Sequence, residues 1–188
     1  MMNQIWQYWK GGITSNQADL IIETGNEQPV ADAALGFDGA TQNDQYRSSE
    51  IRWIPTGTDG HLDAMLWAFA QTANRNAFGF DISYLNDIQY TTYYADKNGK
   101  YDWHHDTFWG NPTAFDRKIS LVIQLSDPQD YEGGDFEIDP QYEGLSAEEI
   151  RAKGTVIAFP SFIRHRVTPV TKGVRRSLVC WVEGPKFR

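Results

Sequence analysis

The sequence contains a single cysteine, no long hydrophobic run and fewer basic than acidic side chains. One thiol cannot form a disulfide within the chain, and Cys180 lies in an alternating apolar run. We therefore expect a buried thiol and a reducing, cytoplasmic location. The first ten residues lack a basic segment followed by a long apolar one, so the sequence predicts neither a signal peptide nor a transmembrane segment.

The chain carries 17 Lys and Arg against 25 Asp and Glu, a formal net charge of -8. An acidic surface repels polyanions, so we expect neither nucleic acid nor an anionic membrane as a partner. The 188 residues suffice for a sizeable core and can form one jelly-roll domain. No repeat, low-complexity run or interdomain linker interrupts them, and we expect a single domain.

The first half of the chain predicts helices around one strand. Helix-starting residues at 14–17 precede an apolar stripe that ends near Gly25, so a first helix is expected there. Alternation over residues 46–54 predicts a strand that Pro55 ends. A second helix is expected after the turn at 58–60, where apolar residues recur at helical spacing: Leu62, Met65, Leu66 and Phe69.

The second half predicts short strands separated by turns. The expected strands are 86–94, 103–107, 118–125, 134–138, 155–159, 165–170 and 175–182. A short helix is expected at 146–153, where Ser146 and Glu149 have capping-box spacing. We predict a mainly β (α+β) domain built on a double-stranded β-helix, the jelly roll of cupin-like barrels. Residues 85–188 would form this core, and residues 1–84, part of the same domain, would brace one face with helices.

Two histidines and one carboxylate have the pattern of a metal site. If 103–107 is a strand, His104 and Asp106 share one face, while His105 lies on the other and is not expected to bind metal. His165 completes a set of two histidines and one carboxylate. Such a set leaves coordination positions open and is typical of non-heme Fe(II) oxygenases.

The last expected strand places an arginine beside this site. Arg175 shares a face with Ser177, Val179 and Trp181, and we expect that face to point into the barrel. An arginine there can bind a carboxylate through two parallel hydrogen bonds. Arg176 competes for this role, but its parity with Cys180 places it on the opposite face, toward the helices.

These residues occur in one order with two further segments, Gly133–Phe136 and Gly154–Ser161. From Tyr90 to Val182 the chain resembles the Fe(II)/2-oxoglutarate oxygenases, specifically their prolyl 4-hydroxylase-like branch. The resemblance implies Fe(II) and 2-oxoglutarate as cofactors and ascorbate as a reductant. It also implies hydroxylation of a protein or peptide, at proline, with release of succinate and carbon dioxide.

The resemblance also implies roles for individual residues. His104, Asp106 and His165 would bind iron, and Arg175 would bind the far carboxylate of 2-oxoglutarate. Tyr94 or its neighbour Tyr93 would bond the same carboxylate, and Gln124, which stands where relatives often carry tyrosine, would be a weaker helper. The tryptophans near the motifs would contact the substrate: Trp103, Trp109 and Trp181.

Three alternatives remain open at this point. The first keeps the chemistry but takes a free amino acid or another small molecule as substrate. The second is nucleic-acid demethylation, which the acidic charge disfavours, as does the absence after Arg175 of that branch's usual second arginine. The third is a cupin-like binding module whose metal has a structural or sensing role. Formation of succinate would exclude the third.

Overall fold

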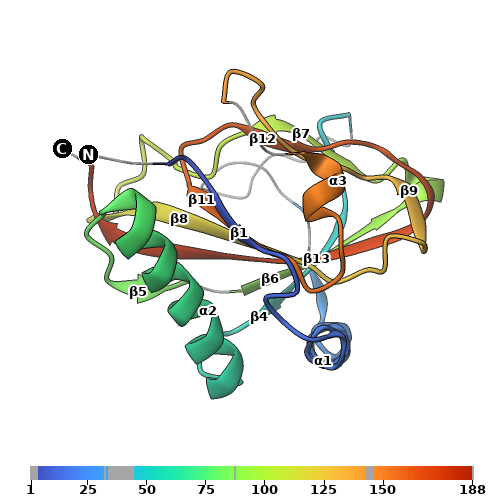
Figure 1. The fold of residues 1–188 in the computed structure, drawn as a ribbon, viewed down its shortest axis with the longest axis horizontal. Helices are drawn as coiled ribbons and strands as arrows, with labels where there is room; N and C mark the ends of the chain where they lie inside the picture. The colour runs from blue at the N-terminus through green and yellow to red at the C-terminus, as the bar shows by residue number, and fades with distance from the viewer. Residues whose placement is uncertain (1–3, 32, 34–44, 87, 143–145, 188) are drawn as a thin grey trace.

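Two antiparallel β-sheets lie face to face, with two helices on the outer side of the larger sheet (Figure 1). The computed structural model describes residues 4–31, 33, 45–86, 88–142 and 146–187. Within these residues the larger sheet has nine strands in the order β1-β11-β8-β13-β6-β4-β2, with β5 and β9 paired to β13. The smaller sheet has four strands in the order β10-β12-β7-β3. This arrangement matches the predicted mainly β fold.

The strands of the larger sheet are β1 (Gln7–Trp9), β2 (Val30–Ala31), β4 (Glu50–Ile54), β5 (Tyr84–Leu85), β6 (Ile88–Tyr94), β8 (Phe115–Gln124), β9 (Tyr131–Gly133), β11 (Val156–Pro160) and β13 (Val170–Pro185). Those of the smaller sheet are β3 (Arg47–Ser48), β7 (Lys100–His104), β10 (Phe136–Ile138) and β12 (His165–Val167). The helices are α1 (Ser15–Glu27), α2 (Gly60–Ala73) and α3 (Ala147–Ile150), with a π-helical turn at Asn74–Phe78 and a 3-10 turn at Ala95–Lys97.

Helix α1 begins as predicted, because Thr14 and Gln17 form a capping box. It ends at Glu27, two residues later than expected. Gly25 does not stop the helix. It admits the ring of Tyr90, which a Cβ atom at this position would approach to 2.5 Å. The glycine therefore serves close packing between the helix and β6.

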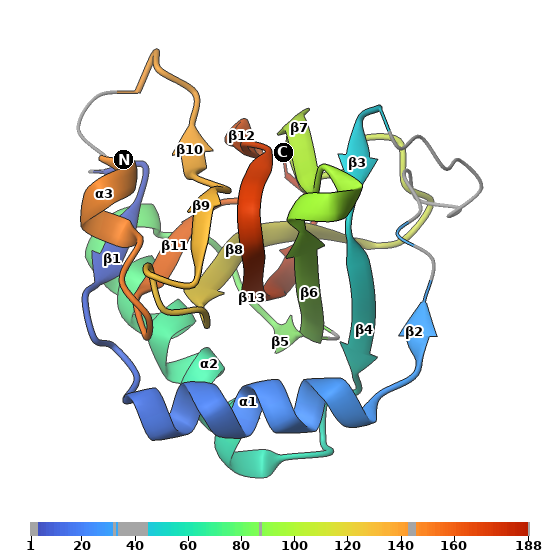
Figure 2. The ribbon, with the colours of Figure 1, turned by 90° about the vertical axis from the view of Figure 1, so that its right-hand side faces the viewer.

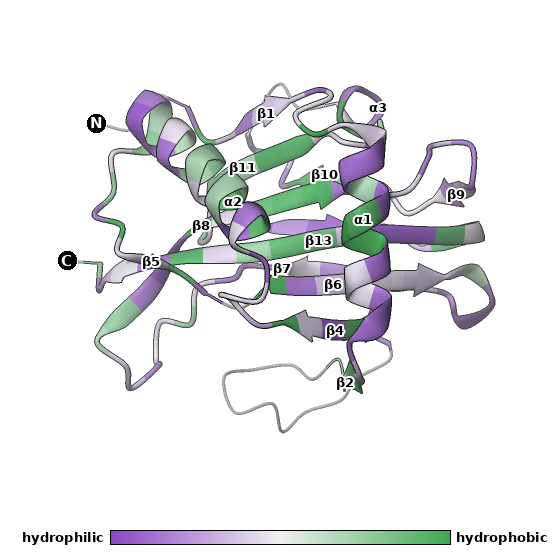
Figure 3. Cartoon of the chain, turned by 90° about the horizontal axis from the view of Figure 1, so that it is seen from below, coloured by the Kyte–Doolittle hydropathy of each residue, from purple (hydrophilic) through white to green (hydrophobic). Residues whose placement is uncertain are grey.

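Helices α1 and α2 cover the outer face of the larger sheet (Figures 2 and 3). Their apolar residues pack on those strands in one buried cluster that includes Ala18, Ile21, Leu66, Ile88, Leu121, Leu178 and Cys180. A second cluster lies on the inner side of the larger sheet and includes Tyr93, Val122, Phe136, Phe159 and Val167. Strands from residues 1–84 pair with the later ones, β1 with β11 and β4 with β6. The N-terminal part thus contributes to the larger sheet as well as to its cover.

Several predicted boundaries were wrong in ways that affect the site. Strand β7 ends at His104, so Asp106 lies in the turn that follows. The expected strand 165–170 is divided, because β12 ends at Val167 and β13 starts at Val170.

Ser146 makes no side-chain bond at the start of α3, and the predicted capping box is absent. In the described part of the chain, no helix is long and apolar enough to cross a lipid bilayer.

Candidate metal centre and cosubstrate pocket

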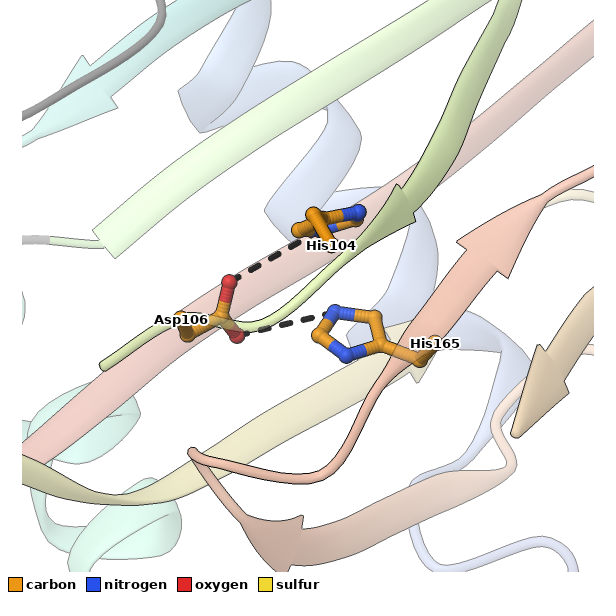
Figure 4. Close-up of side chains that lie close together, drawn as sticks. All are labelled: His104, Asp106 and His165. Atoms are coloured by element: carbon orange, nitrogen blue, oxygen red, sulfur yellow. Dashed lines mark ion pairs between the residues drawn. The ribbon is translucent and has the colours of Figure 1, made fainter. Parts of the chain in front are cut away.

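The two histidines of the motif are partners on neighbouring strands. His104 ends β7 and His165 begins β12, and the two residues lie opposite each other in the register of these strands. Asp106 is placed by the turn after β7, where its backbone N–H donates to the carbonyl oxygen of Ser161 at 2.7 Å. One ligand atom from each of the three residues lies within 4.8 Å of the others (Figure 4). The structure thus assembles the predicted set, although a turn rather than strand parity positions the carboxylate.

Both imidazoles present the same nitrogen to the carboxylate. Nδ1 of His104 lies 2.7 Å from the carbonyl oxygen of Asp102, and Nδ1 of His165 lies 2.9 Å from that of Ile163. Because a carbonyl only accepts, each Nδ1 carries the proton and each Nε2 keeps a free lone pair. These Nε2 atoms lie 3.7 and 3.6 Å from the two oxygens of Asp106.

Burial and neighbouring charges set the protonation of this cluster. Burial, with a smaller contribution from His165, lowers the pKa of His104 to about 3, so its imidazole is neutral at pH 7. Burial alone would raise the pKa of Asp106, but both histidines, Arg117 and a hydrogen bond from Ser120 lower it to about 2. A neutral imidazole and a carboxylate are the forms that bind a divalent metal, and the donor set fits Fe(II).

A pair of serines orients the carboxylate of Asp106. Ser120 on β8 donates its hydroxyl to Oδ2 of Asp106 at 2.7 Å. Its oxygen lies 3.0 Å from the hydroxyl oxygen of Ser161, and all three side chains are buried. Bonds to the outer side of a ligand fix its direction, so the serines hold the carboxylate toward the histidines. Ser120 interrupts an otherwise apolar run in β8, a signal that the sequence interpretation left unused.

Arg175 is a buried cation that has no anionic partner among the described residues. Its side chain is 1% exposed, and its Nη2 donates to Oε1 of Gln124 at 2.8 Å. A weaker bond of 3.4 Å joins Nη1 to the hydroxyl of Ser177, and Nε has no partner in the described structure. A buried guanidinium is costly unless an anion compensates its charge. The site therefore fits a carboxylate group of 2-oxoglutarate.

The tyrosine beside Arg175 is Tyr93. Tyr93 lies opposite Arg175 in the register of β6 and β13, and the guanidinium carbon lies 5.3 Å from the centre of its ring. Its neighbour Tyr94 has the opposite strand parity, does not line the cavity, and has the Lys97 ammonium 5.0 Å from its ring. Of the two tyrosines that the sequence left open, the structure thus favours Tyr93, and a role of either in binding 2-oxoglutarate stays a prediction. Gln124, in contrast, contacts Arg175 directly.

The cluster and Arg175 line one cavity of about 980 Å³. Trp103 and Trp181 line it as well, and the guanidinium carbon of Arg117 lies 3.8 Å from the centre of the Trp181 ring. Trp109 is 58% exposed, lies outside the lining, and packs against Phe187 with ring centres 5.7 Å apart. The sequence interpretation missed several other lining residues: Arg47, Gln89, Tyr101 and Arg117.

A jelly roll that carries two histidines and one carboxylate beside a buried arginine defines the class of non-heme iron oxygenases. The family model of the 2OG-Fe(II) oxygenase superfamily matches residues 88–183 of the chain. The chain therefore belongs to the 2OG-Fe(II) oxygenase superfamily, which confirms the predicted family. Fe(II) and 2-oxoglutarate give this superfamily its name, and the residues of the cavity fit both.

Two curated relatives match part of the chain. A PKHD-type hydroxylase of Synechococcus sp. is 43% identical over 65 residues, which cover 35% of this chain and 28% of that protein. A PKHD-type hydroxylase of Teredinibacter turnerae is 36% identical over 88 residues, which cover 45% of this chain and 38% of that protein. The chain thus matches less than two fifths of the length of either relative.

Two solved structures share the whole fold. A Pseudomonas putida prolyl-4-hydroxylase has a TM-score of 0.71 and 18% identity, covering 98% of this chain and 95% of that one. The viral collagen prolyl hydroxylase from Paramecium Bursaria Chlorella virus-1, in complex with 2OG, has a TM-score of 0.71 and 16% identity, covering 97% of each chain. At this identity the likeness shows the fold, and it confirms the predicted double-stranded β-helix.

Proposed function

We propose that this chain is an Fe(II)- and 2-oxoglutarate-dependent dioxygenase that hydroxylates a protein or peptide at proline. The observation that carries the proposal is the presence, in one cavity, of the His104, Asp106 and His165 cluster and of Arg175, a buried cation that no described carboxylate neutralises. The hydroxylase names of the relatives and the prolyl hydroxylase names of the structural neighbours support the reaction and the substrate class. The single buried thiol supports a reducing, cytoplasmic location.

The residues of the chain divide the work in this proposal. His104, Asp106 and His165 would hold Fe(II), which with 2-oxoglutarate supplies the activation of dioxygen. Arg175 would bind the far carboxylate of 2-oxoglutarate, and Gln124 would keep the guanidinium in place through its existing hydrogen bond. The reaction would place one oxygen atom in the substrate and one in succinate, with loss of carbon dioxide. Ascorbate would serve as reductant when the metal becomes oxidised.

The direct test is incubation of the purified chain with Fe(II), 2-oxoglutarate, ascorbate and a panel of proline-containing peptides. We expect succinate formation above the peptide-free background and a mass gain of one oxygen in a peptide. Matched peptides with alanine in place of the proline should gain no oxygen. An Asp106→Ala variant should form no succinate, because it lacks the carboxylate ligand.

The same experiment separates the alternatives. Oxygen gain in free amino acids, but in no peptide of a broad panel, would support a small-molecule hydroxylase instead. Metal binding without any succinate formation would support a binding module. Either result would contradict the proposal of a prolyl hydroxylase.

A further inference from the structure

Arg47 is a second buried arginine in the cavity. It comes from the N-terminal part of the chain, whereas Arg175 lies in the last strand. It belongs to β3, is 7% exposed, and lines the cavity. Its Nε donates to the hydroxyl of Ser49 at 2.9 Å, and its Nη2 donates to Oε1 of Gln89 at 2.8 Å. Both acceptors are neutral. The side chain is thus fixed in one direction, while its positive charge is not compensated within the described structure.

Two other arginines of the cavity have an anion assigned to them. Arg164 lies 3.4 Å from Asp139, and Arg175 would receive the carboxylate of 2-oxoglutarate. Burial lowers the pKa of Arg117, and the attraction of Asp106 and then Glu183 opposes this shift. No ion pair joins Arg47 to a carboxylate of the described residues, although a buried guanidinium normally has such a partner.

The position of Arg47 relates it to the metal cluster. Its guanidinium carbon lies 4.4 Å from the centre of the Tyr101 ring, and the Tyr101 ring lies stacked on His104 with centres 3.5 Å apart. Arg47 is therefore one aromatic ring away from a metal ligand. A substrate group that binds Arg47 would hold a neighbouring part of the same molecule close to the metal.

We propose that Arg47, held by Gln89 and Ser49, is a binding site for a carboxylate of the substrate. This inference rests on the proposed function and narrows its substrate class to an acidic molecule, in which the carboxylate stands close to the hydroxylated carbon. In a peptide substrate this carboxylate belongs to a glutamate or aspartate beside the proline. The net charge of the chain is -8, so the protein as a whole repels an acidic ligand. The attraction for the carboxylate would come from the single cation of Arg47 inside the cavity.

The test measures binding to the protein loaded with Fe(II) and 2-oxoglutarate in the absence of oxygen. Two labelled peptides differ only in a glutamate or a glutamine next to the proline. We expect the glutamate peptide to bind about ten- to a hundredfold more tightly, the range of a charge-assisted bond in a desolvated site. Unlabelled glutamate peptide should compete for binding, and free glutamate at the same concentration should not.

Arg47→Gln should reduce the ratio of the two affinities to about one. Lys172→Gln removes the same charge from an exposed position, where Lys172 pairs with Glu132, and should leave the ratio unchanged. If Arg47→Gln does not fold, Arg47→Lys keeps the charge without the planar fork and should give an intermediate ratio. The comparison of the two peptides on the unmodified protein also stands without any variant.

Equal binding of the two peptides by the unmodified protein would overturn the inference, and so would a ratio that survives in Arg47→Gln. These failures differ from those of the proposed function. Oxygen gain in proline peptides without any charge preference would overturn the role of Arg47 alone. A charge preference that depends on Arg47, without oxygen gain under turnover conditions, would overturn the hydroxylase proposal alone.

Discussion

The ring of Tyr101 lies parallel to the imidazole of His104, with ring centres 3.5 Å apart and an angle of 13° between the planes. The imidazole is also held at Nδ1 by the carbonyl oxygen of Asp102. The stack limits rotation of the ring, and the hydrogen bond directs Nε2 toward Asp106. Tyr101 thus acts on the metal site through His104, in the same way that Ser120 acts on it through Asp106.

Replacing Tyr101 should weaken metal binding without removing a ligand. We expect Tyr101→Ala to lower the affinity for Co(II) about tenfold, because loss of an outer contact leaves the ligand less well oriented. Tyr101→Phe keeps the stacked ring and should bind Co(II) as the unmodified chain does. Titration followed by visible absorption measures both. Equal affinities for the alanine variant and the unmodified chain would show that the stack has no positioning role.

Removal of His165 should abolish metal binding. Two remaining ligands do not hold a labile divalent ion, so His165→Ala should neither bind Fe(II) nor form succinate. Its circular dichroism spectrum should match that of the unmodified chain. His105→Ala is the matched control for metal binding, because His105 lines the cavity but does not belong to the cluster. Undiminished succinate formation by His165→Ala would exclude this histidine from the site.

The two adjacent arginines of β13 should differ strongly in their effect on 2-oxoglutarate. Arg175→Ala should raise the concentration needed for half-maximal turnover about ten- to a hundredfold, because a charge-assisted bond in a buried pocket contributes about 1.5–3 kcal/mol. Arg176→Ala should change it little, since Arg176 has the opposite strand parity and does not line the cavity. Titration of 2-oxoglutarate on both variants measures the difference, and the reverse order would refute the assignment of the anchor.

The metal-free protein should lose stability as the pH falls below about 6.5. The pKa of His104 is about 3 in the folded chain and 6.5 in the absence of the fold, so the unfolded chain binds more protons between these values. The stability is fully present above pH 6.5 and decreases toward pH 3 by on the order of a few kcal/mol. Asp106 adds a further loss from pH 3.8 toward 2.

Urea unfolding of the metal-free chain between pH 7.5 and 5 measures this dependence. His104→Gln removes the titrating group and should give a flatter curve over that range. His61→Gln is the control, because His61 lies in the first turn of helix α2 and outside the cavity. If the stability of His104→Gln depended on pH as steeply as that of the unmodified chain, a group other than His104 would be responsible for the pH dependence.

Trp109 is predicted to contact the substrate outside the cavity. We expect Trp109→Ala to raise the KM for proline peptides several-fold, because exposed aromatic side chains commonly contact a partner. Binding of Fe(II) should not change, since Trp109 lies outside the metal cluster. Tyr84→Ala removes another exposed aromatic side chain and is the control. An unchanged KM in Trp109→Ala would remove this residue from the substrate surface.

The sequence predicted what short-range patterns determine. The capping box at Thr14 and Gln17 requires residues three apart, and the two faces of β13 follow from a period of two. Asp106 was predicted as a metal ligand from strand parity. Its position depends instead on a backbone hydrogen bond to Ser161, which the alternation of a strand does not predict. Arg47 was missed because its partner Gln89 is 42 residues away.

The choice between Tyr93 and Tyr94 depended on a turn that the sequence left open. The 3-10 turn at Ala95–Lys97 and Asn98, whose φ is 50°, set the length of the connection from β6 to β7. The predicted spacing could count either tyrosine as the partner of Arg175. Only the register of β6 with β13 decides, and that register is a contact between segments about 80 residues apart in the chain.

Strand β13 also carries a buried thiol, that of Cys180, whose reaction with a labelling reagent can report on local opening of the fold. Cys180 is 1% exposed and packs toward the helices, while its neighbour Trp181 lines the cavity on the other face. Burial raises the pKa of this thiol, so a thiol reagent can react only when the layer of helices opens. The labelling rate of Cys180 therefore measures local opening behind the cavity. Its change upon loading with metal and 2-oxoglutarate would reveal whether ligands on one face of the strand slow motions on the other.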